Sequence, residues 1–324
     1  MKVIKAIFWS ILAIAAVLGV LYLTGILYPD GEKAESYPNT DWMAALPDTR
    51  KLSEINIPGT HDSATQYIFP TYFLQDQNTS ITEQLMNGYR YLDIRVALAG
   101  PLGEEELVMK NSFGQCRRGT AIWDETLTYH QVVRETLDFL KAHPGETVIF
   151  VVKPENSDDN PERVRELIEA EIEEDSKLWF TRNTIPLLRE VRGKIVLCRR
   201  YEDGKGLNFN WEDQGDAAVL RDPAAPMDMS YTEKVYVQDR YHYSPDDKWN
   251  AFTGTLKDSK AGRNAFMLNF LSISYGTIPH PAKDAKDLNE RFLQMPLQKG
   301  QIYGVMLFDF ATPEIAAKVI GTNG

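Results

Sequence analysis

Short runs of apolar and β-branched residues alternate along most of this chain with stretches of helical periodicity. Each run is about as long as a buried strand in a globular protein. The pattern therefore predicts eight strands, at residues 53–57, 91–96, 106–110, 148–152, 194–198, 235–238, 265–269 and 304–308.

Helical periodicity between these runs predicts helices at residues 80–87, 129–142, 161–173 and 313–320. Two of them begin with a proline, which suits a first helical turn because no N–H is needed there. Eight strands, each followed by a crossover, predict an α/β fold of the (β/α)8 TIM-barrel type. Some connections are too short for a full helix, so we expect an irregular barrel. The 324 residues suit one such domain.

The N-terminus carries an apolar run over residues 6–28, which as a helix would span roughly 34 Å, enough to cross a bilayer. Lys2 and Lys5 precede the run, and acidic residues follow it. This charge distribution favours a cytoplasmic N-terminus with the rest of the chain outside. We expect a transmembrane helix at 1–28, acting as an uncleaved signal anchor, a tether at 29–40 and the barrel at 41–324.

This division places the protein in the cell membrane as a single-pass chain with an extracytoplasmic catalytic domain. The alternative is a cleaved signal peptide, in which case the domain is secreted. No small-x-small cleavage site closes the apolar run, which favours the anchor.

Composition narrows the possible partners. A hydrophobic fraction of 43% is ample for a core, and the net charge of −11 argues against nucleic acid and against broad electrostatic docking on anionic lipid. The two cysteines, Cys116 and Cys198, are too few for a disulfide framework and lack metal-ligand spacing. Two free thiols are expected, with a single bridge as the alternative.

Candidate chemistry begins in the run IPGTHDS at 57–63, which places His61 beside Asp62 after a strand. Arg95 lies near the end of the next strand. A titratable base beside a fixed cation suits chemistry at a phosphodiester, because one group takes a proton and the other neutralises oxyanion charge. A histidine that merely caps a turn is the alternative reading of such a run.

Other predicted strands also end in polar or charged residues. The carboxyl ends of barrel strands build one catalytic face, so these side chains are expected to gather there. They are His61, Asp62, Arg95, Lys153, Arg199, Arg200, Asp239, Asn269 and Asp309. Basic groups converging on one face of an acidic protein favour a small anionic substrate.

Several motifs, in the same order, are similar to those of the bacterial phosphatidylinositol-specific phospholipase C family, the X-domain type of phosphodiesterase. The resemblance covers about residues 41–321. It rests on IPGTHDS at 57–63, GYRYLDIR at 88–95, FLKAHPGETVI at 139–149, RGKIVL at 192–197, RY at 200–201, VQDRY at 237–241, NFLS at 269–272 and FDF at 308–310.

The resemblance implies a role for each catalytic residue. His61 is the general base that takes the proton of the inositol 2-hydroxyl as this oxygen attacks phosphorus. Asp309 holds the imidazole ring. Arg95 binds a non-bridging phosphate oxygen, and Asp62 lies near the leaving oxygen.

The resemblance also implies an inositol pocket made of Lys153, Arg200, Asp239 and Tyr241. Trp211 either flanks this pocket or meets lipid at its rim. Calcium-dependent relatives carry acidic ligands where Arg95 stands, so the resemblance implies neither a metal nor any other cofactor.

One position departs from the family. The second catalytic histidine belongs at the end of the third strand, where this chain has Asn111. Asparagine cannot donate a proton, and losing a general acid typically costs about 10²–10⁴ in rate. Four replacements are conceivable: Lys110, Asp62, the segment 113–127 with Arg117 and Arg118, and His280.

The sequence therefore predicts a membrane-anchored, metal-independent phosphodiesterase. It would cleave an inositol phospholipid to diacylglycerol and a cyclic inositol phosphate. One alternative is a catalytically impaired pseudo-enzyme that binds inositol or phospho-head groups, and another is a phosphodiesterase for a different head group. The expected partners are the lipid substrate and the membrane, with no nucleic acid and no prediction for protein partners.

Overall fold

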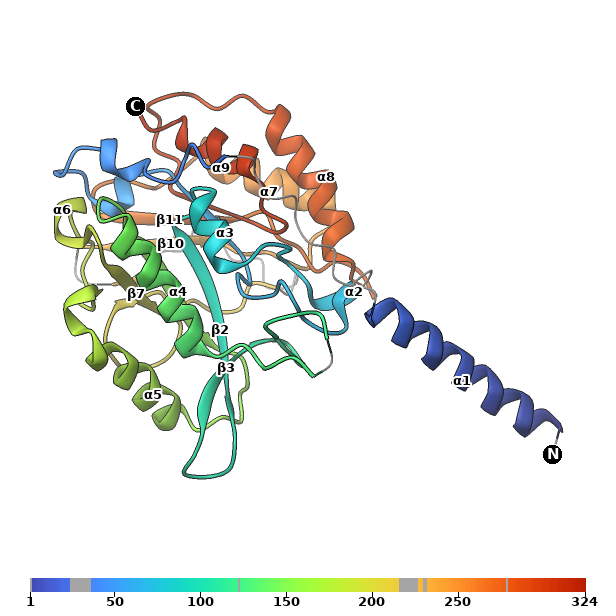
Figure 1. Cartoon of the computed structure of the whole chain (residues 1–324). Coiled ribbons are helices and arrows are strands. Elements are labelled where there is room, and N and C mark those ends of the chain that lie inside the picture. Colours follow the sequence, from blue (N-terminus) through green and yellow to red (C-terminus); the bar gives the residue numbers. More distant parts are fainter. Residues whose placement is uncertain (1, 24–35, 122, 216–226, 230–231, 278) are drawn as a thin grey trace.

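The computed structural model describes residues 2–23, 36–121, 123–215, 227–229, 232–277 and 279–324. Its core is a curled, mainly parallel sheet with helices on the outside (Figure 1). The strands are β1 (Ile57–Thr60), β2 (Tyr91–Ala99), β3 (Glu106–Asn111), β4 (Gly114–Gln115), β5 (Val148–Pro154), β6 (Trp179–Phe180), β7 (Ile195–Arg199), β8 (Leu207–Asn208), β9 (Met227–Asp228), β10 (Lys234–Gln238), β11 (Ala265–Phe270) and β12 (Val305–Phe308).

The α-helices are α1 (Lys2–Leu23), α2 (Thr71–Leu74), α3 (Ile81–Met86), α4 (Tyr129–Ala142), α5 (Pro161–Glu174), α6 (Leu188–Val191), α7 (Pro245–Lys257), α8 (Pro281–Gln294) and α9 (Pro313–Ile320). Short 3-10 turns cover Met43–Ala45, Leu52–Glu54 and Ser176–Leu178. The four predicted helices are confirmed to within a residue at most of their ends. α7 and α8 were not predicted.

The sheet runs in the order β6-β7-β5-β2-β1-β12-β11-β10-β9, with β8 attached to β7 and the β3–β4 hairpin to β2. The seven strands from β7 to β10 along this path are mutually parallel. In the part of the chain that the structure describes, no ladder joins the two ends of the path. The predicted α/β fold with an irregular TIM-type barrel is confirmed, as a barrel that is incompletely closed by hydrogen bonds.

The first strand was predicted in the wrong place. Residues Leu52–Glu54 form a 3-10 turn, and β1 begins at Ile57, where the prediction ended. Pro58 and Gly59 resemble a turn but lie within the strand. The absence of a side chain at Gly59 lets β1 approach β2, since a Cβ there would lie 3.0 Å from that of Tyr91. His61 therefore follows the strand without an intervening turn.

The third predicted strand exists but is not one of the parallel strands of the barrel. β3 pairs antiparallel with β2, with Val96 opposite Met109. The connection at 100–105 is a short turn containing Gly100 and Gly103, both at positive φ. Such a turn makes a hairpin, because parallel strands need a longer crossover. The count of eight equivalent strand-and-crossover units was wrong in this respect.

Three apolar clusters hold these elements together. One lies between β2, β5, β7 and the helices α3, α4 and α5. A second fills the inside of the curled sheet, and a third packs α7, α8 and α9 against β11 and β12. The polar side chains at the strand ends are thus supported by packed apolar layers on both faces of the sheet.

Helix α1 is the isolated helix in Figure 1, and the side chains of Lys2–Val20 are exposed. It is long and apolar enough to cross a membrane, with a mean hydropathy of 2.3 over its most apolar window. A signal sequence passes the same test. Most of the predicted tether lies outside the described residues, and Thr40 at its end is buried and donates a hydrogen bond to the Met86 carbonyl.

Candidate active site

A cavity of about 830 Å³ opens at the carboxyl ends of the parallel strands. This is the face on which barrel enzymes carry their active sites. Nine residues singled out in the sequence line it: His61, Asp62, Arg95, Asn111, Lys153, Arg200, Trp211, Asp239 and Tyr241. A tenth, Asp309, lies directly behind His61. Two other strand-end residues lie elsewhere, since Asn269 is buried against the Phe252 carbonyl and Arg199 binds the Tyr201 carbonyl.

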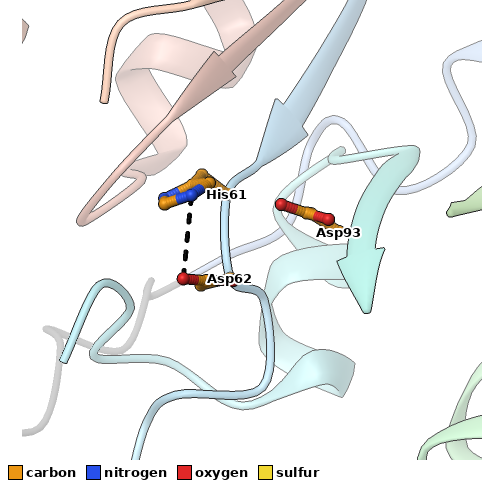
Figure 2. A group of neighbouring side chains, drawn as sticks. All are labelled: His61, Asp62 and Asp93. Atoms are coloured by element: carbon orange, nitrogen blue, oxygen red, sulfur yellow. Dashed lines mark ion pairs between the residues drawn. The ribbon is translucent and has the colours of Figure 1, made fainter. Parts of the chain in front are cut away.

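Carboxylates hold the imidazole of His61 on two sides. Its Nδ1 lies 2.8 Å from Asp309 Oδ1, and its Nε2 lies 3.7 Å from Asp62 Oδ2; the second pair is drawn in Figure 2. Burial alone would lower the pKa of His61, but the charges of Asp62 and Asp309 and the Asp309 hydrogen bond raise it to about 10. The imidazole is therefore protonated at neutral pH.

The backbone places these groups through the register of neighbouring strands. Because β1 pairs with β12, Thr60 lies opposite Phe308, and the His61 N–H donates to the Phe308 carbonyl. The next residues on the two strands are thus brought together, His61 with Asp309. Asp62 has a φ of 42°, a left-handed conformation that turns its carboxylate toward the cavity side of the ring.

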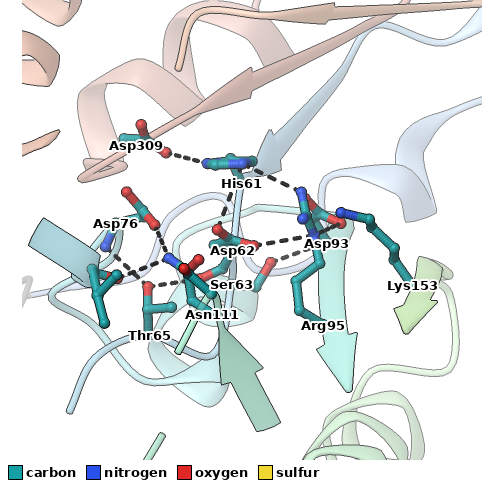
Figure 3. A network of polar contacts seen from close by, with 12 residues as sticks. His61, Asp62, Ser63, Thr65, Asp76, Asp93, Arg95, Asn111, Lys153 and Asp309 are labelled. Atoms are coloured by element: carbon teal, nitrogen blue, oxygen red, sulfur yellow. Dashed lines mark hydrogen bonds and ion pairs between the residues drawn. The ribbon is translucent and has the colours of Figure 1, made fainter. Parts of the chain in front are cut away.

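Arg95 supplies the cation of the site (Figure 3). Its Nη2 lies 3.5 Å from His61 Nε2, and its Nε lies 3.1 Å from Asp62 Oδ1. The guanidinium also donates to both carboxylate oxygens of Asp93 and to Glu155 Oε2. Although burial disfavours both charges, Asp62 and Asp93 raise the pKa of Arg95, and Arg95 lowers the pKa of Asp93.

Two groups of metal-ligand side chains occur among the described residues of this cavity. His61 lies with Asp62 and Asp93 in one, and with Asp76 and Asp309 in the other, with ligand atoms within 4.8 Å. In the first group the Arg95 guanidinium pairs with both carboxylates. The arginine side chain therefore supplies the positive charge that a metal ion would bring. In the second group Asp76 and Asp309 already accept hydrogen bonds from Asn111 and His61. We therefore assign a metal to neither.

On the far side of the cavity, positively charged side chains alternate with side chains that donate or accept hydrogen bonds. The Arg200 guanidinium stacks on Trp211, with its Cζ 3.5 Å from the ring centroid, and the Trp211 Nε1 donates to Asp239 Oδ2. The hydroxyl of Tyr241 donates to Asp213 Oδ1. Burial, and then the nearby charge of Arg95, lowers the pKa of Lys153.

The position of Trp211 separates its two predicted roles. Only 7% of the residue is exposed, and it lies in the cavity wall beneath Arg200. This placement fits the pocket wall and does not fit contact with lipid at the rim.

Asn111 lies in the cavity wall and is partly exposed. Its Nδ2 donates to the Leu74 carbonyl and, over 2.7 Å, to Asp76 Oδ2 (Figure 3). Of the predicted replacements for the missing histidine, Asp62 lines the cavity beside His61, whereas Lys110 and His280 do not line it. Lys110 donates to Asn156, and the His280 ring stacks on Tyr72 with centroids 4.1 Å apart.

In the segment 113–127, Phe113 lines the cavity but Arg117 and Arg118 do not. Arg118 is exposed and pairs with Glu125, while Arg117 donates to the Asp124 carbonyl. Both arginines line a separate small depression.

The sequence analysis missed four acidic residues around the cavity: Asp76, Asp93, Glu155 and Asp213. Asp93 had a signal, because it precedes Arg95 by two residues on the same face of a strand. Asp76, Glu155 and Asp213 lie on loops and had no periodic signal.

Exposed aromatic side chains line or adjoin the cavity, and we call Tyr72, Phe73 and Phe113 the cavity-mouth aromatics. Phe73 and Phe113 line it and are largely exposed, and exposed Tyr72 adjoins Phe73 on α2. Exposed Tyr275 lies in the loop between β11 and α8.

Comparisons with known proteins agree with the motifs. No family model matches the chain. It is 29% identical over 337 aligned residues to a 1-phosphatidylinositol phosphodiesterase from Listeria monocytogenes, covering 94% of this chain and 96% of that protein. It is 25% identical to a protein of the same name from Staphylococcus aureus, covering 85% and 82%.

Solved structures show the same fold. The phosphatidylinositol-specific phospholipase C from Listeria monocytogenes matches with a TM-score of 0.67 at 23% identity, over 88% of this chain and 99% of that one. A mutant of the Staphylococcus aureus enzyme matches with a TM-score of 0.72 at 22% identity, over 89% and 99%. The resemblance drawn from the motifs is confirmed, and the chain is a homologue of the bacterial phosphatidylinositol-specific phospholipases C with their barrel fold.

Proposed function

We propose that this protein is a phosphodiesterase of the phosphatidylinositol-specific phospholipase C type. It cleaves an inositol phospholipid to diacylglycerol and a cyclic inositol phosphate. The names of its bacterial homologues support the substrate class. One geometric observation carries the proposal: the imidazole of His61 and the guanidinium of Arg95 lie 3.5 Å apart in one cavity.

In the proposed reaction, His61 takes the proton of the inositol 2-hydroxyl through Nε2. The hydroxyl oxygen then attacks phosphorus while the bond to the diacylglycerol oxygen breaks. Asp309 accepts a hydrogen bond at Nδ1, which fixes the ring and stabilises the imidazolium that forms. Arg95 neutralises the charge that grows on a non-bridging phosphate oxygen.

The inositol ring is proposed to bind where Lys153, Arg200, Asp239 and Tyr241 line the cavity. Charged donors and acceptors in alternation suit a ring that carries a hydroxyl on each carbon. The ring face would rest on Tyr241, and the stacked pair of Arg200 and Trp211 would form the opposite wall.

The reaction is proposed to need no metal, since Arg95 occupies the space between Asp62 and Asp93. The test uses the full-length protein in mixed micelles that contain phosphatidylinositol, with and without a chelator. Turnover is expected to be the same in both and to be lost in His61→Ala. Turnover abolished by the chelator and restored by a divalent cation would contradict metal independence.

His143→Ala is the matched control. His143 also pairs with an aspartate, Asp41 at 2.9 Å, but it caps the carboxyl end of α4, outside the cavity. This variant is expected to keep wild-type turnover. Wild-type protein that gives no cyclic product at high concentration would contradict the proposed function.

Asn111 favours a second candidate function, a pseudo-enzyme that binds inositol or phospho-head groups without cleaving them. Calorimetry that shows binding of myo-inositol, together with no turnover, would support it. Turnover that appears only in Asn111→His would indicate that catalysis has been lost. If wild-type protein cleaves phosphatidylinositol, this alternative is excluded.

We also propose that the protein acts at a bilayer. Helix α1 is long enough to span it, and the aromatic groups at the cavity mouth, Tyr72, Phe73 and Phe113, suit contact with acyl chains. Holding the domain near the bilayer raises the local substrate concentration without electrostatic attraction, which a net charge of −11 would oppose.

A further inference from the structure

The diacylglycerol oxygen must gain a proton as it leaves phosphorus, and Asn111 cannot provide one. The carboxyl of Asp76 lies beside Asn111 in the same cavity wall. Asp76 is in the loop between α2 and α3 and is 5% exposed.

The backbone of Asp76 is fixed on both sides. Its N–H donates to Thr65 Oγ1, and its carbonyl accepts from the Phe310 N–H. The first contact joins it to the loop after β1, and the second to the loop after β12. The carboxyl is therefore held in place relative to both His61 and Asp309.

Three acid groups crowd this corner of the cavity: Asp62, Asp76 and Asp309. A carboxyl oxygen of Asp76 lies within 4.8 Å of ligand atoms of both His61 and Asp309, and Asp62 lines the same cavity. Burial first, and then the charges of Asp309 and Asp62, raise the pKa of Asp76 well above its usual value, while His61 opposes the rise. Neighbouring carboxyls share protons because like charges so close cannot both ionise easily.

Asn111 determines how Asp76 presents its proton. The amide donates to Oδ2 over 2.7 Å, which favours Oδ2 as the carbonyl-type oxygen. The proton is then carried by Oδ1. A histidine at position 111 could serve as an acid itself, whereas the asparagine orients one.

Two other acidic groups of the described cavity wall, Glu155 and Tyr241, fit the role less well. Burial would raise the pKa of Glu155, but Arg95 and Lys153 lower it, so Glu155 is ionised. Burial and Asp213 raise the pKa of Tyr241, which makes this phenol a weak acid.

We propose that Asp76 is the general acid of this enzyme, oriented by the hydrogen bond from Asn111. The inference rests on the proposed phosphodiesterase function. As the 2-hydroxyl oxygen bonds to phosphorus, its proton passes to His61. The bond from phosphorus to the diacylglycerol oxygen breaks, and that oxygen takes the proton of Asp76. Solvent then returns a proton to Asp76 and removes one from His61.

The test compares two substrates in Asp76→Asn and in wild type. Phosphatidylinositol has an alkoxide leaving group that needs a proton. An inositol phosphodiester with a 4-nitrophenyl group releases a stable phenolate that needs none. Asp76→Asn is expected to lower kcat on phosphatidylinositol by about 10²–10⁴ and to change turnover of the nitrophenyl substrate by only a few fold.

Two further variants serve as a control and as a rescue for this result. Asp138→Asn removes an exposed carboxylate on α4 and is expected to leave both rates unchanged. Adding Asn111→His to Asp76→Asn introduces a histidine that can act as the acid for the leaving diacylglycerol oxygen. We expect the double variant to recover part of the rate of phosphatidylinositol cleavage. Recovery would also show that Asp76→Asn folds.

The pH dependence gives an independent readout. Asp76 must be protonated to act, so cleavage of phosphatidylinositol is expected to fall as pH rises through its raised pKa. This alkaline limb should be missing with the nitrophenyl substrate and in Asp76→Asn. The charged groups that face Asp76 are Asp62, Asp309 and His61. All three are present both in wild type and in Asp76→Asn.

The outcomes separate the two proposals. If wild type cleaves neither substrate, the proposed function fails, and the role of Asp76 fails with it. If wild type cleaves both and Asp76→Asn slows both equally, or neither, the function stands and the general acid is a different group.

Discussion

His61 carries a proton at neutral pH because two carboxylates adjoin it, and a general base must first lose that proton. Asp62 and Asp309 raise the pKa of its imidazole to about 10 despite burial. The catalytically useful neutral ring therefore becomes more abundant as pH rises. With the nitrophenyl substrate, which needs no general acid, we expect kcat/KM to increase from neutral pH toward that value, in contrast to an exposed histidine, which is half titrated near pH 6.5.

Asp309→Asn should separate the two effects of this carboxylate on the ring. The variant removes a charge and a strong acceptor at Nδ1, so the pKa of His61 is expected to fall toward its ordinary 6.5. The acidic limb of kcat/KM should move to lower pH, while kcat falls by about 10²–10⁴ because the ring is no longer oriented. Rate profiles and NMR titration of the imidazole measure both. An unmoved limb would contradict the assignment of His61 as base.

The sequence allowed His61 and Arg95 to be predicted because both lie in or directly after strands, and strand ends converge in any barrel. Asp76 could not be predicted in this way. It lies on a loop with no periodic pattern, and its chemistry depends on three partners: Asp62, Asp309 and Asn111. Its proximity to these residues follows only from the folded arrangement of three loops.

At the scale of elements, the errors of prediction have identifiable physical causes. Pro58 and Gly59 usually mark a turn, yet Gly59 is needed within β1 because Tyr91 on β2 lies so close. β3 was recognised as a strand from its apolar residues, but composition does not encode the direction of pairing. The short turn with Gly100 and Gly103 was the available signal for a hairpin.

A buried ion pair joins the N-terminal segment to the sheet. Arg90, just before β2, pairs with Glu146, just before β5, over 2.9 Å, and both side chains are fully buried. Glu146 also accepts the N–H groups of Met43 and Ala44, and Arg90 donates to the carbonyl of Thr40. One pair therefore fixes the start of two neighbouring strands and the chain that enters the barrel.

Arg90→Leu is expected to lower the free energy of unfolding by about 3–5 kcal/mol, because it leaves a buried carboxylate without its cation. Chemical denaturation measures the change. Arg182→Leu is the control, since Arg182 and its partner Glu190 form an exposed pair that contributes about 1 kcal/mol or less. Adding Glu146→Leu to Arg90→Leu should recover part of the loss. Equal effects of the two single variants would contradict a structural role for the buried pair.

At the scale of the whole molecule, charge is unevenly distributed. The protein has a net charge of −11, yet Arg95, Lys153 and Arg200 meet in one cavity. The cations attract a phosphate only within short range, since salt screens charges beyond about 10 Å. In the proposed function, recognition of the head group and attraction to the bilayer would thus be carried by different parts of the chain, the second by α1 and the aromatic groups at the cavity mouth.

The final prediction concerns helix α1 as a membrane anchor. If α1 spans the bilayer and is retained, the full-length chain should stay in the membrane pellet after alkaline extraction, and its intact mass should include α1. Ile11→Lys with Ile14→Lys is expected to release it, since each charge near the helix centre costs about 2.5–3.5 kcal/mol of insertion free energy. Ile11→Leu with Ile14→Leu is the matched control and should remain in the pellet. A soluble protein whose first residue lies beyond residue 28 would show instead that α1 is a cleaved signal, and the cavity-mouth aromatics alone would then hold the enzyme at its substrate.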